Sequence, residues 1–431
     1  MKSLGIKVLP KSVQIIFALL SLLSLLFVWD IGPIVTSDSR AYFGMWPYVS
    51  GGYPFFLRGL HAVFGMSFHN VAVGIQFFGV IGSIFLFLTI FLAKFKMKQY
   101  QLLILLVVLF YPIIDSNLLI VNNISTEGLS YMLFLVLILT SYFIYVSKQR
   151  KFYVLLVLIT TILITIRGQF KFLIPLFVII ELITQIKDNR INLKIIGVII
   201  TIPILTFMID VSYHRLIQKQ FFVTPFTWTT LVSSVMFVSD ESDSQYIENE
   251  EAKIIFKLIH KEFRAKKIGY RDHKYFQEPI DYNYTFYHYE FPTICNQTVQ
   301  QVAVKYFEKK HNDKIKAYID TENIHKQLFF DLLPHNFSKW IALAFQNFKN
   351  GFGGITVALI YIIIVILLLK YYIMFNDKVL LFSAFLIIIM LANKTLVSVT
   401  VHSIIRYFFY TNWIPIFLLF LGINRLKIKA H

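Results

Sequence analysis

Long apolar runs recur along the chain and are separated by short polar segments. A helix needs about 20 mostly apolar residues to cross the hydrocarbon of a bilayer, and ten stretches approach this length. The runs are continuous rather than alternating, so they predict membrane-spanning helices and not the strands of a barrel. The predicted spans are residues 13–29, 71–93, 101–121, 128–147, 152–167, 170–186, 195–212, 354–374, 379–397 and 404–424.

One long polar region interrupts this pattern between the seventh and eighth predicted spans. Residues 213–352 carry 18 basic and 16 acidic residues. The apolar stretch at its start contains Pro225 and many β-branched residues, which favours a packed or interfacial segment over a span. Helical periodicity follows at residues 245–267, 298–311, 313–333 and 336–349.

Three regions follow from this pattern. We expect an N-terminal membrane module at residues 1–212, a mostly helical extracytoplasmic domain at 213–352, and a C-terminal membrane module at 353–431. Composition agrees, because 57% of the residues are hydrophobic and only 15% are charged, against about 25% in an ordinary globular protein. The single cysteine, Cys295, excludes a disulfide framework or a thiolate metal cluster within one chain.

The net charge of +17 is concentrated in particular loops. Seventeen of the 41 basic residues lie near the termini and in alternate loops between predicted spans. The positive-inside rule therefore predicts that both termini are cytoplasmic and that residues 30–70 and 213–352 face outward. The charge reflects topology and does not indicate nucleic acid.

Few charges remain on the predicted outer face outside the large polar region. Ionisable groups near lipid are costly and are usually functional or paired. A transporter places its binding site near the midplane, whereas this distribution favours chemistry at the outer surface. The acidic members are Asp30, Asp38, Asp115, Glu127 and Asp210, and the basic members are Arg40, Arg58, Arg167, Lys171, Lys394 and Arg406.

Four short motifs each contain at least one of these charged residues. The first outer loop contains Asp38, followed by Tyr42 and by "GGYPFFLRGL" with Tyr53 and Pro54. The other three motifs are "STEGLSYM" with Glu127, "TIRGQFKFLIPL" with Arg167, and "HSIIRYFFYTNWIPIFLL" with Arg406 and Tyr407. In this order, the motifs resemble those of the GT-C superfamily of polytopic glycosyltransferases, of the protein O-mannosyltransferase and aminoarabinose transferase type.

The resemblance implies a GT-C fold and an inverting transfer of sugar from a polyprenyl-phosphate donor. The acceptor would be a lipid-linked glycan, an envelope polysaccharide or a protein. Asp38 is our candidate general base, and Glu127 would orient the acceptor, bind a metal or assist the base. Candidates for binding the donor phosphate are Arg406, Arg167, Lys171, Arg58 and Arg40. Candidates for lining the substrate pocket are Tyr42, Tyr53, Tyr407, His402 and Asp115.

Each leading candidate also has a purely structural interpretation. Asp38 stands in a helix N-cap context, and Glu127 would favour the dipole of the helix that it begins. Arginines can extend to lipid headgroups without any catalytic role. We expect the Tyr-rich segment 270–291 to serve packing or the membrane interface, and the spacing of His273 and His288 is not a zinc pattern.

Rival functions are a polymerase or ligase of lipid-linked polysaccharide, a transporter or flippase of a lipid-linked sugar, and a structural scaffold. The composition favours a bacterial plasma membrane as the location. No Gly-rich nucleotide loop is present, and the sequence specifies no cofactor, with a divalent cation left open. The expected partners are the lipid donor, the acceptor and the bilayer. The sequence names neither the sugar nor the acceptor.

Overall fold

Helices account for 82% of the chain in the computed structural model, which describes residues 9–95, 97–189, 191–271 and 280–429. In that part of the chain, β-structure is limited to one parallel bridge between Ile34 and Asn123. Within these described ranges, eight helical segments are long and apolar enough to cross a membrane. The prediction of an all-α membrane protein is therefore confirmed, whereas the count of ten spans stays a prediction.

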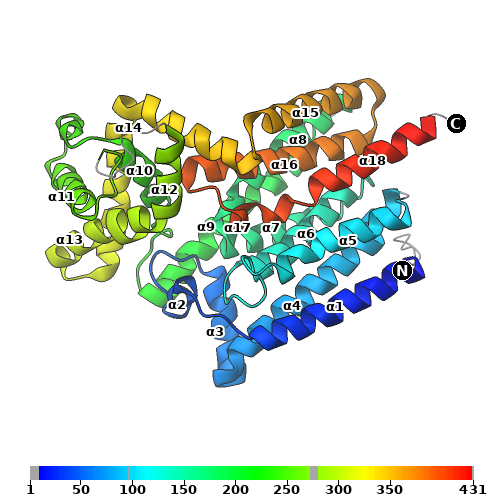
Figure 1. Cartoon of the computed structure of the whole chain (residues 1–431), viewed down its shortest axis with the longest axis horizontal. Coiled ribbons are helices and arrows are strands. Elements are labelled where there is room, and N and C mark those ends of the chain that lie inside the picture. The colour runs from blue at the N-terminus through cyan, green and yellow to red at the C-terminus, as the bar shows by residue number, and fades with distance from the viewer. Residues whose placement is uncertain (1–8, 96, 190, 272–279, 430–431) are drawn as a thin grey trace.

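The apolar helices lie side by side in a bundle, with the chain termini together at one end (Figure 1). Four of them, α5, α7, α8 and α18, are only 15 or 16 residues long. The helices of the bundle are α1 (Lys11–Ile31), α4 (Phe68–Leu86), α5 (Gln99–Ile114), α6 (Glu127–Tyr145), α7 (Phe152–Ile166), α8 (Leu173–Lys187), α9 (Leu193–Gln218), α15 (Ile355–Phe375), α16 (Lys378–Thr400) and α18 (Ile414–Lys429).

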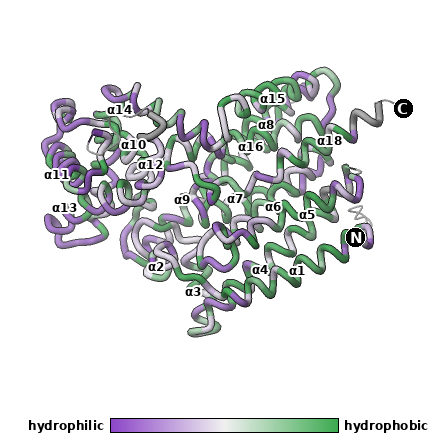
Figure 2. Tube along the Cα trace, viewed as in Figure 1, coloured by the Kyte–Doolittle hydropathy of each residue, from purple (hydrophilic) through white to green (hydrophobic). Residues whose placement is uncertain are grey.

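Burial decreases from the centre of this bundle to its periphery. The most apolar window of α6 is 83% buried, while those of α1, α9 and α15 are at most 17% buried. The peripheral helices expose Ile and Leu side chains. The traces of these helices are mostly hydrophobic in Figure 2. Because apolar surface is stable against lipid tails but not against water, this arrangement suits helices that surround a core and face the bilayer.

Two predicted spans differ from the observed helices. Helix α5 ends at Ile114 rather than at residue 121, because Pro112 lies in its last turn and Asp115 begins a polar loop. The predicted span 404–424 is broken into α17 (Ile405–Phe408), a 3-10 turn (Phe409–Thr411) and α18. At this break the Tyr407 carbonyl accepts hydrogen bonds from two side-chain amides.

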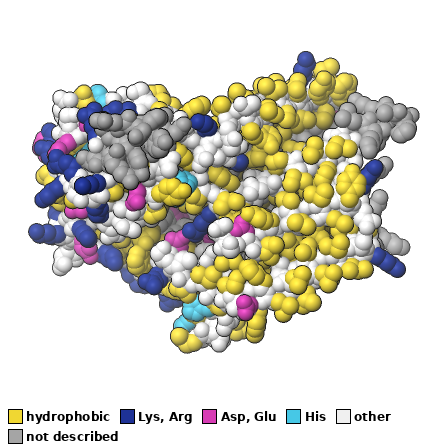
Figure 3. Space-filling model, viewed as in Figure 1, with side chains coloured by type: hydrophobic (Ala, Val, Ile, Leu, Met, Phe, Trp, Pro, Cys, Tyr) yellow, Lys and Arg dark blue, Asp and Glu magenta, His cyan; other side chains and the backbone are white. Residues whose placement is uncertain are grey.

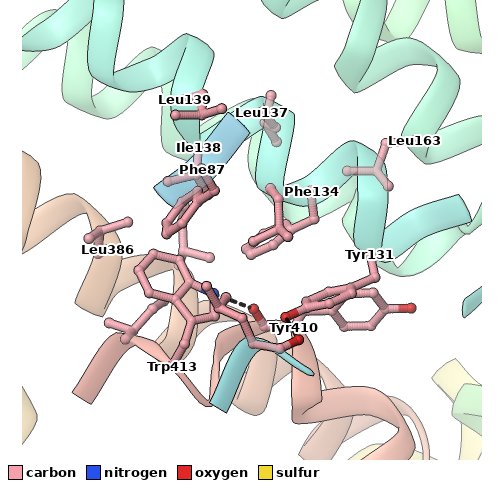
Figure 4. Packing of buried hydrophobic residues seen from close by; sticks show 14 of the residues in the cluster. Phe87, Tyr131, Phe134, Leu137, Ile138, Leu139, Leu163, Leu386, Tyr410 and Trp413 are labelled. Atoms are coloured by element: carbon pink, nitrogen blue, oxygen red, sulfur yellow. Dashed lines mark hydrogen bonds between the residues drawn. The ribbon is translucent and has the colours of Figure 1, made fainter. Parts of the chain in front are cut away.

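The break is held by a dense aromatic core (Figure 4). Trp413 is fully buried and donates its indole N–H to the Tyr410 carbonyl at 3.0 Å. Its ring packs edge-on against Phe87, and the ring of Tyr410 lies near Phe134 and Phe170. Large aromatic side chains supply much of the packing energy in such a core.

A second, more polar group of helices lies at the end of the bundle opposite to the termini (Figures 1 and 2). We call it the distal unit. It has its own hydrophobic core, which includes Phe237, Phe256 and Leu328. Its helices are α10 (Thr227–Val238), α11 (Glu250–Lys266), α12 (Ile280–Ile294), α13 (Gln301–His311) and α14 (Lys314–Phe352).

Helix α14 is 39 residues long and replaces the two helices predicted at 313–333 and 336–349. It contains Pro334, but packs against α10 and α13 along one part and α16 and α15 along another. These contacts support it on both sides of the proline. The apolar segment after Pro225 forms α10, which is largely buried within the distal unit rather than long enough to span.

Candidate functional site

Four charged residues from distant parts of the sequence meet where the bundle adjoins the distal unit. Asp38 lies in the first turn of α2 (Ser37–Phe43), and Glu127 is the first residue of α6. Arg167 directly follows α7, and Arg406 lies in α17. Each comes from one of the four sequence motifs. We refer to these four residues as the charge cluster.

Direct ion pairs connect all members of the charge cluster. Arg406 donates from Nη2 to Asp38 Oδ2 at 2.7 Å, and from Nε to Glu127 Oε1. Arg167 donates from Nη1 to the same Glu127 oxygen at 2.6 Å. The two carboxylates balance the two guanidinium groups. Charges removed from water are tolerated only when they are paired in this way.

The charge cluster has a closed half and an accessible half. The side chains of Glu127 and Arg167 are only 3% and 10% exposed, whereas those of Arg406 and Asp38 are 39% and 44% exposed. Asp38 Oδ1 has no hydrogen-bond partner in the part of the chain that the structure describes. A ligand could therefore reach Asp38 and Arg406, while Glu127 remains covered.

Local structure explains how Asp38 and Glu127 are held. Thr36 and Ser39 form a reciprocal capping box at the start of α2, which fixes the turn that carries Asp38. The bridge between Ile34 and Asn123 ties this loop to the segment before α6. Glu127 occupies the N-terminal turn of α6, where the helix dipole stabilises a negative charge.

Uncharged amides hold Arg167 and the turn beside Arg406, and the sequence interpretation missed them. Gln169 accepts from Arg167 Nε at 2.9 Å and donates to Asn393 Oδ1 at 2.6 Å. Gln169 and Asn393 both donate to the Tyr407 carbonyl at 2.9 Å, which positions the turn beside Arg406. Their only signal in the sequence was a polar side chain near or within an apolar run.

Aromatic side chains surround the charge cluster. The rings of Tyr42 and Tyr53 pack edge-on with centroids 5.0 Å apart, and Tyr53 donates to Gln76 Oε1 at 3.1 Å. The Arg167 guanidinium lies 5.3 Å from the centroid of the Tyr407 ring. Burial, followed by the charges of Asp38 and Glu127, raises the pKa of Tyr42. This phenol therefore stays neutral and can donate a hydrogen bond.

Glycines allow the first outer loop to approach α7 closely. A Cβ atom on Gly52 would lie 2.6 Å from the Thr165 carbonyl oxygen, two residues before Arg167. A Cβ atom on Gly51 would lie 2.5 Å from the ring of Tyr213. Ser50 also donates to the Thr165 carbonyl at 2.8 Å. The "GGYP" segment therefore fixes the loop that carries Asp38 against the helix that carries Arg167.

Several predicted site residues lie outside these ion pairs. The Asp115 carboxylate accepts from the Asn117 N–H at 2.8 Å and so stabilises its own turn. Arg58 contacts Met45 Sδ at 3.3 Å, and both Arg40 and Lys171 are exposed. None of these four side chains forms an ion pair with the charge cluster among the described residues.

His402, a predicted pocket residue, lies in an irregular segment directly before α17. Its ring stacks on Phe291 with centroids 4.7 Å apart, and its Nδ1 donates to the His288 carbonyl at 2.8 Å. Burial lowers the pKa of His402 to about 4, and the nearby charge of Arg406 acts in the same direction. His402 is therefore neutral at pH 7.

The distal unit contacts both loops that contribute to the charge cluster. Tyr48 from the first loop packs against Phe226 and Tyr318, and Ser403 from the late loop donates to the Asn347 carbonyl at 2.7 Å. In the space-filling view, charged side chains are frequent over the distal unit and sparse over the bundle (Figure 3).

The Tyr-rich segment contributes packing where it is described. Tyr287 is fully buried and packs against Phe237 with ring centroids 5.0 Å apart. Tyr284 accepts from Asn350 Nδ2 at 2.7 Å. His273 and Tyr275 lie outside the described residues. In the described part of the chain, no group of three or more His, Cys, Asp or Glu side chains could hold a metal ion.

No protein-family model, curated protein or solved structure matches the chain. The geometry of the charge cluster and the resemblance of its motifs therefore carry the functional argument.

Proposed function

We propose that the protein is a membrane glycosyltransferase of GT-C type. It would transfer a sugar from a polyprenyl-phosphate donor to an extracytoplasmic glycan, lipid or protein. The observation that carries the proposal is the convergence of Asp38, Glu127, Arg167 and Arg406 into one charge cluster. Each of these residues belongs to a different motif of the resemblance, and they are separated by up to 368 positions.

The accessible half of the charge cluster suits the chemistry of this transfer. The acceptor hydroxyl attacks the anomeric carbon and gives its proton to Asp38 Oδ1, which has no other partner among the described residues. The bond between the anomeric carbon and the phosphate oxygen breaks, and the polyprenyl phosphate leaves. A single displacement of this kind inverts the anomeric centre.

Arg406 is placed to bind the leaving phosphate beside the base. It is partly exposed and uses Nε and Nη2 for the two carboxylates, so Nη1 remains for a ligand. A fixed guanidinium stabilises the charge that develops on the phosphate as the bond breaks. In this proposal Glu127 is a positioning residue, since it is buried and binds both arginines.

The proposed orientation places the charge cluster and the distal unit outside a bacterial plasma membrane, with both termini in the cytoplasm. Nucleotide sugars are absent from that side, and a lipid-carried donor could reach Arg406 laterally from the bilayer. The contacts of the distal unit with both site loops support a role in shaping the acceptor site.

The test is transfer by the purified wild type and by Asp38→Asn from a set of polyprenyl-phosphate sugars. Loss of a general base is expected to lower transfer about 10²- to 10⁴-fold. Asp30→Asn is the matched control, because it makes the same change at an exposed position near the end of α1, outside the ion pairs of the charge cluster, and it should retain near-normal transfer. Normal transfer by Asp38→Asn would refute the assignment of the base. If the wild type instead moved a lipid-linked sugar across the membrane of liposomes without transferring it, the protein would be a transporter and the proposed enzyme activity would be refuted.

A further inference from the structure

A large open cavity lies at the opposite end of the bundle, where the described chain begins and ends. Its volume is about 1020 Å³. It is lined by residues near the turns that join α6 to α7, α8 to α9 and α15 to α16. Helix α6 separates the cavity from the charge cluster, because Glu127 is the first of its 19 residues and Tyr145, which lines the cavity, is the last. The proposed transfer therefore does not account for the cavity.

Basic side chains dominate the rim of this cavity. Lys148 and Lys378 lie 3.9 and 3.6 Å from the Asp188 carboxylate. Arg150 and Lys194 also line the cavity, and neither has a carboxylate partner within the described ranges. Four cations therefore face two acids, Asp188 and Glu181, which leaves a net positive charge at the cavity.

One residue that lines the cavity, Tyr145, has a buried hydroxyl that could donate a hydrogen bond to a ligand. Tyr145 is 3% exposed, and its hydroxyl forms no hydrogen bond with any residue that the structure describes. The Glu181 carboxylate beside it is already occupied, because it accepts from Tyr153 at 2.6 Å and from Gln185 at 2.7 Å. A buried hydroxyl without a partner is costly, so the position favours a ligand that brings an acceptor oxygen.

Apolar side chains stand beside the cations at the mouth. Ile191 and Leu193 line the cavity and are 67% and 72% exposed. A soluble anion would gain nothing from these side chains, whereas an amphipathic ligand could cover them with an acyl chain. Basic pockets between membrane helices suit the headgroups of anionic lipids.

We infer that this cavity binds the phosphate headgroup of an anionic membrane lipid. The phosphate lies between Arg150 and Lys194 and accepts a hydrogen bond from the Tyr145 hydroxyl, while an acyl chain covers Ile191 and Leu193. Basic residues at this end are also expected for topological reasons. The cavity and the unpartnered hydroxyl are what distinguish a specific site from a general attraction to the leaflet.

The full-length protein in neutral detergent provides the test. The probe is phosphatidylglycerol, and binding is measured from the rise in the unfolding midpoint as the lipid is titrated. Phosphatidylcholine and inorganic phosphate serve as comparison ligands. We expect phosphatidylglycerol to bind more tightly than either, and Arg150→Gln/Lys194→Gln to weaken its binding about 30-fold. Tyr145→Phe removes only the hydroxyl and should weaken it about fivefold.

The matched control is Lys94→Gln/Lys98→Gln, which removes two exposed cations at the same end but outside the cavity. It should change binding less than threefold. Equal losses in the two double variants would show general attraction to anionic lipid and overturn the site. Binding of inorganic phosphate as tight as that of the lipid would overturn the lipid assignment. These outcomes do not depend on transfer activity, so they leave the proposed function untouched.

Discussion

Two buried glutamates near opposite ends of the bundle are held in contrasting ways. Glu127 is 2% exposed and pairs with the guanidinium groups of Arg167 and Arg406. Glu181 is 3% exposed and accepts hydrogen bonds from the neutral side chains of Tyr153 and Gln185. Burial alone therefore does not mark a functional acid. The partners do, because only Glu127 fixes cations beside an accessible carboxylate.

Replacing each glutamate by glutamine gives the largest expected contrast. Glu127→Gln leaves the buried guanidinium of Arg167 without a carboxylate and Arg406 with only Asp38, and should lower the free energy of unfolding by about 3–5 kcal/mol. Glu181→Gln keeps an acceptor for Tyr153, and should lower it by about 1 kcal/mol. Thermal unfolding of both variants in one detergent measures the difference.

Equal destabilisation by the two variants would contradict the proposed difference between Glu127 and Glu181, since it would mean that the arginines do not need the Glu127 charge. Transfer activity offers a second comparison. We expect Glu127→Gln to lose transfer, because Arg406 is no longer held, and Glu181→Gln to retain it.

We expect a smaller effect when a guanidinium of the charge cluster is replaced by an ammonium. Arg406 reaches two carboxylates through two different N–H groups, and the single ammonium of lysine cannot reproduce that geometry. We expect Arg406→Lys to lower kcat/KM for transfer about 10- to 100-fold, since each factor of ten corresponds to about 1.4 kcal/mol. Steady-state kinetics with the best donor measures this.

Arg264→Lys is the control for that substitution. Arg264 also holds a carboxylate, that of Glu241, through two N–H groups, but this pair is about half exposed on the distal unit. Exposed pairs contribute about 0–1 kcal/mol, so transfer should not change. A similar loss of kcat/KM in both variants would show that the protein does not tolerate replacement of arginine by lysine in general. It would refute the proposed role of Arg406 in binding the phosphate.

The sequence predicted the charged half of this site and missed the neutral half. Asp38, Glu127, Arg167 and Arg406 are conspicuous because charges are rare near apolar runs. Gln169 and Asn393 carry no charge, and their importance depends on bonds to a carbonyl up to 238 positions away. The periodicity of a sequence does not predict hydrogen bonds between residues so far apart in the chain.

Two details of the predicted fold were wrong for the same physical reason. The break after α17 depends on those amides and on the aromatic packing around Trp413, whereas residues 404–424 look like one continuous span. Conversely, the two helices predicted at 313–333 and 336–349 form the single helix α14, because contacts with other helices support it on both sides of Pro334. The cavity near Arg150 was missed because its cations were interpreted only as markers of topology.

The smallest expected effect is a difference in pH response between the two ends. His402 is buried beside the charge cluster, and its pKa is lowered to about 4 by burial, with His288 and Arg406 nearby. In an opened state the ring would regain a pKa near 6.5. Between these values the opened state binds more protons, so stability at this end falls as the pH falls from about 6.5 to 4, by at most about 1.4 kcal/mol per pH unit.

The cavity at the other end is lined by no histidine among the described residues. Amide hydrogen exchange should therefore accelerate in residues 397–408 between pH 7 and 5, after correction for intrinsic rates, but not in residues 145–153. His402→Phe should abolish the difference, because its ring cannot take up a proton but can still stack on Phe291. A pH response of residues 397–408 that persists in His402→Phe would assign it to another group, and one shared by both ends would remove the contrast between them.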